Sequence, residues 1–211
     1  MCSYPVVLNL QNRAVLVVGG GKVAERKIDS LLESKAKVFL VSKDLTEHIK
    51  DLINEKKIVF LGKEFSDEHL NGKFIIIVAT DDHSFNSYVA DKARKRGILV
   101  NVVDQPSECD FFVPSVLRRG DLIISVSTSG KSPFLSKKIK EELALIYGIE
   151  YQILLEIFSV IRKILIRAKR DDSVKNEVYE FLYNSKIIDK IKEKDVEGIK
   201  EIFLQLSNII R

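Results

Sequence analysis

The sequence has little cysteine, no long apolar run and almost no excess of either charge. Its two cysteines, Cys2 and Cys109, lie far apart without a partner at metal-ligand spacing, which predicts free thiols in a reducing compartment or at most one incidental pair. No apolar stretch approaches the roughly 20 residues that span a bilayer. The first residues also lack the basic and apolar regions of a signal peptide. We therefore expect a cytoplasmic protein without a membrane partner.

The formal net charge is only +4, although 30% of the 211 residues are charged. Nucleic-acid-binding proteins usually cluster basic residues far more strongly, so this balance predicts no nucleic-acid partner. It leaves room for a local basic patch that faces an acidic small molecule. His48, His69 and His83 have no Cys, Asp or Glu at a recognised ligand spacing, and we predict no metal site.

Hydrophobic residues make up 45% of the chain, which is ample for a packed core. Short apolar runs that suit strands buried on both faces alternate with amphipathic segments that suit helices. The strand runs are residues 13–18, 37–41, 57–61, 73–79 and 97–102, and the helical segments are 22–34, 44–56 and 81–96. This alternation predicts an α/β fold with a Rossmann-type parallel sheet.

After residue 110 the pattern changes to a small α+β region. Two extended runs joined by Arg119-Gly120-Asp121 predict an antiparallel hairpin. A helix should follow, with Ser132 at its N-cap, Pro133 at its first position and Gly148 after its end.

The tail has apolar residues at three- and four-residue spacing, which predicts three or four packed helices with breaks near 170–173 and 184–186. We therefore expect three parts. They are a dinucleotide-binding domain over 1–113, a hairpin-plus-helix region over 114–148, and a helical domain over 149–211.

The glycines of "VVGGGKVAERK" lie between a predicted strand and a predicted helix. Gly19, Gly21 and Ala24 match the small-residue spacing of the dinucleotide-binding turn, in which the amides at the helix N-terminus face the pyrophosphate. We add Lys22 and Val23 to the cofactor contacts. The alternative is a tight bend without a ligand.

Two further turns follow strands of the same sheet. The ribose-binding position at the end of the second strand is Ser42, followed by Lys43 and Asp44, and Lys43 leaves NADP open as an alternative to NAD. In "VATDD", Ala79 and Thr80 are expected on the nicotinamide side, while Asp81 or Asp82 caps the next helix.

Four motifs carry a resemblance to a known family, namely "VVGGGKVAERK", "ATDDHSFN", "NVVDQPSECDFFVPS" and "ISVSTSGKSP". In this order and at these distances, they resemble the precorrin-2 dehydrogenase family, the N-terminal module of siroheme synthases. The resemblance implies that NAD accepts a hydride from precorrin-2 to give sirohydrochlorin, and some members also insert ferrous iron. It implies a homodimer whose central region is the dimerisation region. The methyltransferase module fused to some relatives is expected to be absent.

Asp104 is the candidate catalytic base. It follows the strand at 97–102 and so lies at the carboxyl edge of the sheet, where ligands of such sheets bind. Oxidation of a reduced tetrapyrrole removes a hydride and a proton, and a carboxylate that faces the ring suits the proton. The alternative is that Asp104-Gln105-Pro106 is only a turn.

Precorrin-2 carries many carboxylates, so its site needs basic side chains and amide donors. Ser115, Arg118, Ser129 and Lys131 are the substrate-binding candidates, and Arg119, Lys137 and Lys138 lie nearby. Thr128 stands where some members have a phosphorylated serine, which makes regulation there doubtful.

Two other readings remain. One is an NAD-sensing regulatory domain without catalysis, which would need neither Asp104 nor the "FFVPSV…ISVSTSGKSP" region. The other is a structural dimer that has lost its activity, against which the glycine turn and Asp104 argue.

Overall fold

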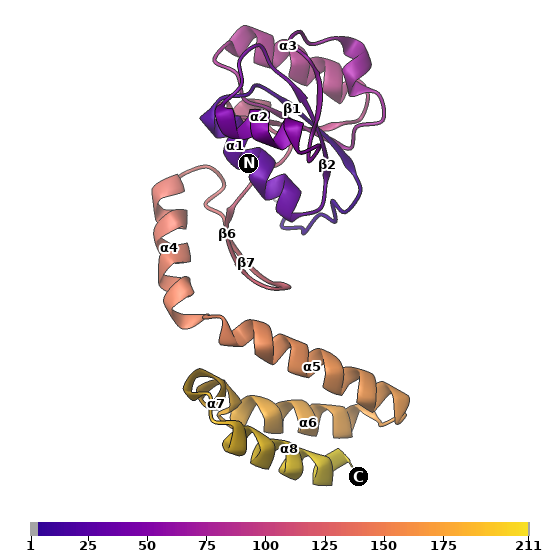
Figure 1. Cartoon of the computed structure of the whole chain (residues 1–211), viewed down its shortest axis with the longest axis vertical. Coiled ribbons are helices and arrows are strands. Elements are labelled where there is room, and N and C mark those ends of the chain that lie inside the picture. The colour runs from indigo at the N-terminus through magenta and orange to yellow at the C-terminus, as the bar shows by residue number, and fades with distance from the viewer. Residues whose placement is uncertain (1–3, 211) are drawn as a thin grey trace. The chain divides into compact units, whose positions relative to one another are not determined.

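The computed structural model describes residues 4–210. The chain divides between Val113 and Pro114 into two compact units, and each is described by itself. Figure 1 shows the first unit in indigo to magenta and the second in pink to yellow. The predicted three-part division stays a prediction.

The first unit contains a five-stranded sheet in the order β3-β2-β1-β4-β5, in which every neighbouring pair is parallel. The strands are β1 Ala14–Val18, β2 Lys37–Val41, β3 Val59–Gly62, β4 Ile75–Val78 and β5 Leu99–Val102. Each lies within or overlaps a predicted run, so the predicted Rossmann-type sheet is confirmed. The chain reverses its direction of travel across the sheet between β1 and β4, and the ligands of such folds bind at this point.

Helices cover both faces of this sheet (Figure 1). Helices α1 (Lys22–Glu33) and α2 (Glu47–Asn54) pack against one face, and α3 (His83–Arg94) packs against the other. Between β3 and β4 the chain forms only the short 3₁₀ turn η1 (Asp67–Leu70). The sheet interior is apolar on both sides, which explains why the strands read as continuous β-branched runs.

The second unit begins with a hairpin and a helix. Strands β6 (Ser115–Arg119) and β7 (Leu122–Val126) pair in antiparallel fashion, and Gly120 in the turn has φ +59°. Helix α4 (Pro133–Ile146) follows, and the Leu135 amide donates to the Ser132 hydroxyl at 3.2 Å. The predicted hairpin, cap and first-turn proline are confirmed.

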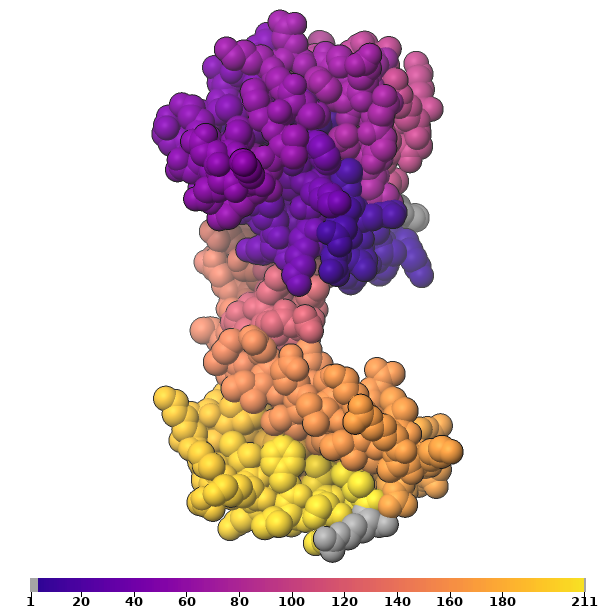
Figure 2. Space-filling model, turned by 45° about the vertical axis from the view of Figure 1, so that its right-hand side comes forward, coloured from indigo at the N-terminus to yellow at the C-terminus, as the bar shows by residue number. Residues whose placement is uncertain are grey.

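Four helices complete the second unit. They are α5 Glu150–Arg167, α6 Asp172–Asn184, α7 Ile187–Glu193 and α8 Val196–Ile210. Lys186 and Lys194 take positive φ values of 58° and 56° and separate the last three helices. Apolar residues from all four form one core that includes Leu165, Val178 and Leu182. Figure 2 shows their side chains packed into one body, coloured orange to yellow.

Within residues 4–210, no single helix is long and apolar enough to cross a membrane. Helices α4 and α5 pass that test only when they are taken together as a bent pair, by length and composition alone.

The central strand gives a prediction about stability. Leu16 is fully buried in the face that α3 covers, so Leu16→Ala should lower the free energy of unfolding by about 2–5 kcal/mol. Val59→Ala is the matched control, because Val59 is 49% exposed and its truncation should change stability by only about 0.5 kcal/mol. Chemical denaturation of both full-length variants measures the difference. Equal losses would show that burial in β1 does not dominate the stability of this unit.

Candidate functional site

The glycine turn between β1 and α1 is built by close backbone packing. Gly19 has φ +111°, and a Cβ there would overlap the carbonyl oxygen of Ala79 at the end of β4. A Cβ on Gly20 would overlap the carbonyl oxygen of Asp44. The sequence pattern pointed to Gly19 and Gly21, and it gave no reason to expect that Gly20 also needs to lack a side chain.

Gly21 differs from the other two glycines because it faces open space. It is the N-cap residue of α1 with φ −79°, and a Cβ there would meet no atom within 4 Å. No side chain caps the helix, so the first amides of α1 are not blocked by a capping group. A helix N-terminus of this kind attracts an anion through its amides and its dipole.

A cleft of about 690 Å³ opens in front of this turn at the carboxyl edge of the sheet. It brings together all of the predicted cofactor residues, which come from three separate turns. They are Gly19, Gly21, Lys22, Val23, Ser42, Lys43, Asp44, Ala79 and Thr80. Their individual contacts with a cofactor stay predictions.

The cleft has a fourth wall that the sequence analysis missed. Lys63, Glu64 and Phe65 follow the end of β3 and line the cleft together with Phe85 of α3. The signal was present in the sequence, because β3 is parallel to β2 and its carboxyl end therefore reaches the same edge.

Hydrogen bonds shape the turn after β2. The Ser42 amide donates to the Gly62 carbonyl at 3.1 Å, and the Ser42 hydroxyl donates to the Asp44 carbonyl at 2.6 Å. Ser42 is 8% exposed, whereas Lys43 and Asp44 are exposed at the mouth of the cleft. Ser42 therefore holds the shape of the turn, and Lys43 and Asp44 line the cleft.

The turn after β4 is locked by a buried amide. Asn86 is fully buried and its Nδ2 donates to the Thr80 carbonyl at 2.9 Å, while the Thr80 hydroxyl donates to Asn86 Oδ1 at 2.5 Å. The Asp82 carboxylate accepts the Phe85 amide at 2.9 Å, which confirms the predicted cap of α3. Ala79 and Thr80 thus lie on a rigid wall of the cleft.

An acidic residue in the first turn of α1 is balanced locally. A hydrogen bond with the Thr46 side chain and then one with Lys22 lower the pKa of Glu25, which lies in the first turn after Gly21. Lys22 reaches Glu25 at 3.0 Å. This pairing reduces the repulsion that a lone carboxylate would exert on a phosphate there.

Asp104 lies two residues beyond β5, at the same edge of the sheet as the cleft, but it does not line the cleft. Its φ is +60°, a conformation that few residues other than glycine adopt and that Asp tolerates better than most. Its side chain is exposed and forms no hydrogen bond or ion pair with any residue of the described chain. The carboxylate is thus accessible to solvent.

The segment after Asp104 returns along β5 through a 3₁₀ turn, η2 (Pro106–Glu108). The Cys109 thiol donates to the Val102 carbonyl at 3.1 Å and accepts the Val102 amide at 3.3 Å. Burial raises the pKa of Cys109, so this free thiol acts as a packing and hydrogen-bonding group rather than as a thiolate. Cys2 lies outside the described residues.

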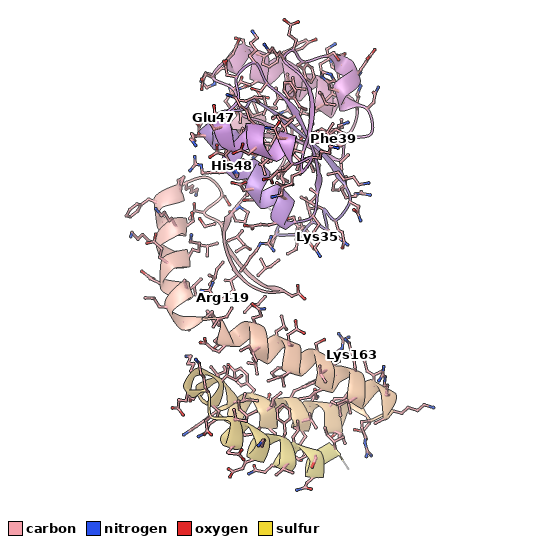
Figure 3. The ribbon with its side chains drawn as sticks, viewed as in Figure 1. Lys35, Phe39, Glu47, His48, Arg119 and Lys163 are labelled. Carbon is pink, nitrogen blue, oxygen red and sulfur yellow. The ribbon has the colours of Figure 1, made fainter. Side chains whose placement is uncertain are left out.

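No group of three His, Cys, Asp or Glu side chains in residues 4–210 is arranged to hold a metal ion. His48 on α2 (labelled in Figure 3) bonds to Asp29 at 2.9 Å, and His69 closes a capping box with Ser66. His83 is the first residue of α3. His48 and His69 therefore form local hydrogen bonds, and His83 begins a helix.

The substrate candidates all lie in the second unit. Ser115 at the start of β6 bonds to the Ser136 hydroxyl of α4 at 3.2 Å. Arg118 and Lys131 are exposed, and Ser129 has φ +51° in the turn before α4. The structure thus brings Ser115 to the beginning of α4, and the substrate contacts of all four residues stay predictions.

The polar groups of the turn at 127–132 form more hydrogen bonds with one another than the sequence indicated. The Thr128 hydroxyl donates to the Ser132 carbonyl at 3.1 Å and accepts the Ser132 amide at 3.0 Å. The amides of Ser129 and Lys131 also donate within the turn. Fewer amides therefore remain for an anion than the motif "STSGKSP" implies.

Arg119, which lies near the substrate-binding candidates, has a structural role. Its Nε donates to the Tyr147 carbonyl at 2.9 Å, and its Nη2 reaches the Ala144 carbonyl at 3.5 Å. Figure 3 shows Arg119 between the hairpin and the last turn of α4. A guanidinium there satisfies carbonyls that have no partner within the helix.

Two family models match the chain. Residues 6–115 match the model described as putative NAD(P)-binding, and residues 119–144 match the model described as sirohaem biosynthesis protein central. A solved structure named "SirC, precorrin-2 dehydrogenase" is 30% identical, covers 98% of this chain and 100% of its own, and superposes with a TM-score of 0.76. The chain belongs to the precorrin-2 dehydrogenase family.

Longer relatives agree with this membership. The siroheme synthase of Mannheimia succiniciproducens is 32% identical over 98% of this chain and 44% of its own length. Siroheme synthase 1 of Serratia proteamaculans is 41% identical over 68% of this chain and 30% of its own. The chain thus spans less than half the length of these relatives. Its first unit is an NAD(P)-binding domain of the Rossmann type.

The open space at Gly21 gives a prediction about cofactor binding. Gly21→Asp should fold normally, because no atom lies within 4 Å of its Cβ, yet it should weaken the affinity for NAD by about tenfold or more. The new carboxylate would repel the pyrophosphate and occupy its approach.

Gly21→Ala is the control, because it adds a Cβ without charge. Calorimetric titration of both folded variants with NAD measures the effect. An unchanged NAD affinity in Gly21→Asp would show that the glycine turn is not part of the cofactor site.

Proposed function

We propose that this protein is an NAD-dependent precorrin-2 dehydrogenase that oxidises precorrin-2 to sirohydrochlorin in siroheme biosynthesis. The observation that carries the proposal is the match to SirC, which covers 98% of this chain and 100% of SirC. The glycine turn and its cleft supply a second, independent argument for a dinucleotide. We choose NAD over NADP because of the family, since Lys43 alone does not decide between them.

The residues of the cleft suit a dinucleotide. The amides that begin α1 would bind the pyrophosphate, with Gly21 leaving room for it. Lys43 and Asp44 would contact the ribose, and Ala79 and Thr80 would border the nicotinamide. The nicotinamide, when bound, supplies the hydride acceptor.

Asp104 would hold the proton that leaves the macrocycle when the hydride leaves. Its carboxylate is exposed at the sheet edge and engaged by no other described side chain, as a base for an incoming ligand requires. Ser115, Arg118, Ser129 and Lys131 would bind the carboxylates of the substrate. We also propose that the reaction occurs in the cytoplasm, and the free thiol of Cys109 agrees with a reducing compartment.

An NAD-sensing role without catalysis is the alternative. A sensor would bind NAD in the same cleft but would leave precorrin-2 unchanged. Anaerobic incubation with precorrin-2 and NAD, followed by absorbance, separates the two functions, because only an enzyme forms sirohydrochlorin.

The catalytic role of Asp104 can be tested directly. Asp104→Asn should lower the single-turnover rate of precorrin-2 oxidation by about 10²-fold or more, because the amide cannot accept the proton. Asn also tolerates the positive φ at this position, so the fold should be retained.

Asp51→Asn serves as the matched control, since Asp51 is an exposed carboxylate on α2 that does not line the cleft. NAD and precorrin-2 affinities are measured separately for each variant. Full activity of Asp104→Asn would show that Asp104 is only a turn residue and not the base.

Insertion of ferrous iron is a further proposal for the same site. Metallation removes protons from the pyrrole nitrogens, and Asp104 would serve as their acceptor. Iron would then be a substrate, delivered to sirohydrochlorin. The same incubation, repeated with ferrous or cobaltous ion, tests this activity by the absorbance of the metallated product.

We propose that the protein is a homodimer whose subunits associate through the second unit. Apolar side chains of α4 and its continuation are exposed in the single chain, among them Phe134 at 71%, Leu145 at 88% and Ile149 at 64%. Large apolar surface of this kind usually marks an interface. The family resemblance points to the same region.

Sedimentation at micromolar concentration should therefore show a dimer, and Leu145→Asp should shift it toward monomer. Leu204→Asp, at a residue that is 67% exposed on α8, is the matched control and should leave the dimer intact. A wild-type protein that sediments only as a monomer would exclude the dimer.

A further inference from the structure

The open edge of β5 is covered by the segment that returns from the Asp104 loop. The Asp110 amide donates to the Val100 carbonyl at 2.8 Å, and the Val100 amide donates to Asp110 Oδ2 at 2.9 Å. Asn101 Nδ2 donates to the Phe111 carbonyl at 2.9 Å. Residues 109–111 therefore hold the far end of the loop against the strand that begins it.

One arginine on the neighbouring helix binds this return segment through hydrogen bonds and ion pairs. Arg94, the last residue of α3, donates from Nη2 to the Glu108 carbonyl at 2.7 Å and to the Glu108 carboxylate at 3.0 Å. Its Nε lies 3.5 Å from Asp110 Oδ1, and its Nη1 lies 3.1 Å from Asp91. A single guanidinium thus joins α3 to the residues on both sides of Cys109.

These ion pairs of Arg94 are partly shielded from water. The side chains of Arg94, Glu108 and Asp110 are 32%, 30% and 31% exposed. Burial opposes the charge, but the hydrogen bond with Glu108 and the charges of Asp110, Glu108 and Asp91 raise the pKa of Arg94 above its ordinary value. Without the guanidinium, the carboxylates of Glu108 and Asp110 would be left near each other with no shared counter-charge.

Asp104 begins this loop in an unfavourable backbone conformation. Its positive φ is unfavourable by about 1 kcal/mol for a residue with a side chain, so the surrounding structure has to maintain it. Its own carboxylate makes no contact that would do so among the described residues. The loop is instead held by its own backbone and by the segment that follows it. The Gln105 amide donates to the Val102 carbonyl at 3.4 Å, and the Cys109 thiol donates to the Gln105 carbonyl at 3.4 Å. Arg94 in turn binds residues 108–110.

We propose that Arg94 is a positioning residue for the reaction, which holds residues 108–110 in place and thereby orients Asp104 toward the macrocycle. The inference rests on the proposed role of Asp104 as the base. Misplacement of a catalytic group by about 1 Å can slow a reaction by about 10²-fold.

Arg94→Gln should therefore lower the single-turnover rate of precorrin-2 oxidation by about 10- to 100-fold, while the NAD affinity stays within about twofold. Arg94→Lys should recover part of the rate, because an ammonium keeps the charge but not the planar fork that bridges several acceptors. Arg96→Gln is the matched control. Arg96 lies just beyond the same helix, pairs with Asp67 at 3.7 Å instead, and its loss should leave the rate unchanged.

A double-mutant comparison separates positioning from general destabilisation. If Arg94 acts through Asp104, adding Arg94→Gln to Asp104→Asn should produce no further loss of rate. A merely structural arginine would lower the rate by the same factor in both backgrounds. Thermal unfolding of each variant verifies that the folded protein is assayed. If Arg94→Gln does not fold, Glu108→Gln takes its place in the test. This variant keeps the backbone contact with Arg94, so it should lower the rate by a smaller factor than the one expected for Arg94→Gln.

The outcomes distinguish a failure of this inference from a failure of the proposed function on which it rests. Wild-type protein that binds NAD but does not oxidise precorrin-2 would overturn the proposed function and the positioning role with it. A normal rate for Arg94→Gln, or the same factor of loss in the Asp104→Asn background, would overturn only the positioning role.

Discussion

The contact between Gly19 and the carbonyl of Ala79 is the constraint on which the rest of the site depends. β1 and β4 are neighbours in the sheet but not in the sequence, and their carboxyl ends meet here without room for a side chain. Because the turns after β1 and β4 pack this closely, the start of α1 and the wall at Thr80 border the same cleft. Any side chain at Gly19 would force these turns apart.

Much of this arrangement was predictable because it follows local rules. Buried parallel strands read as β-branched runs, and a serine followed by a proline marks the start of α4. The shared cleft of the predicted cofactor residues could be predicted for the same reason, since the carboxyl ends of parallel strands meet at one edge. The same rule extends to Lys63 and Phe65 after β3, which the sequence analysis overlooked.

Contacts between distant side chains were not predictable. The pairing of Asn86 with Thr80 buries an amide whose partner lies outside its helix, and no periodicity indicates it. Arg119 is one of several basic residues near the substrate candidates, and the sequence does not indicate its hydrogen bond with the Tyr147 carbonyl after α4. Arg94 was one cation among many on an amphipathic helix, and only the return of residues 108–110 to β5 gives it a particular role.

The return segment has a second consequence, for solubility. β5 is an outer strand of the sheet, and an outer strand with unpaired amides and carbonyls is a template for pairing with another chain. Asp110 and Phe111 accept hydrogen bonds from a backbone amide and a side-chain amide of β5, and Asp110 places a charged carboxylate beside the strand. The segment that follows the Asp104 loop therefore also covers an edge that could otherwise pair with another chain.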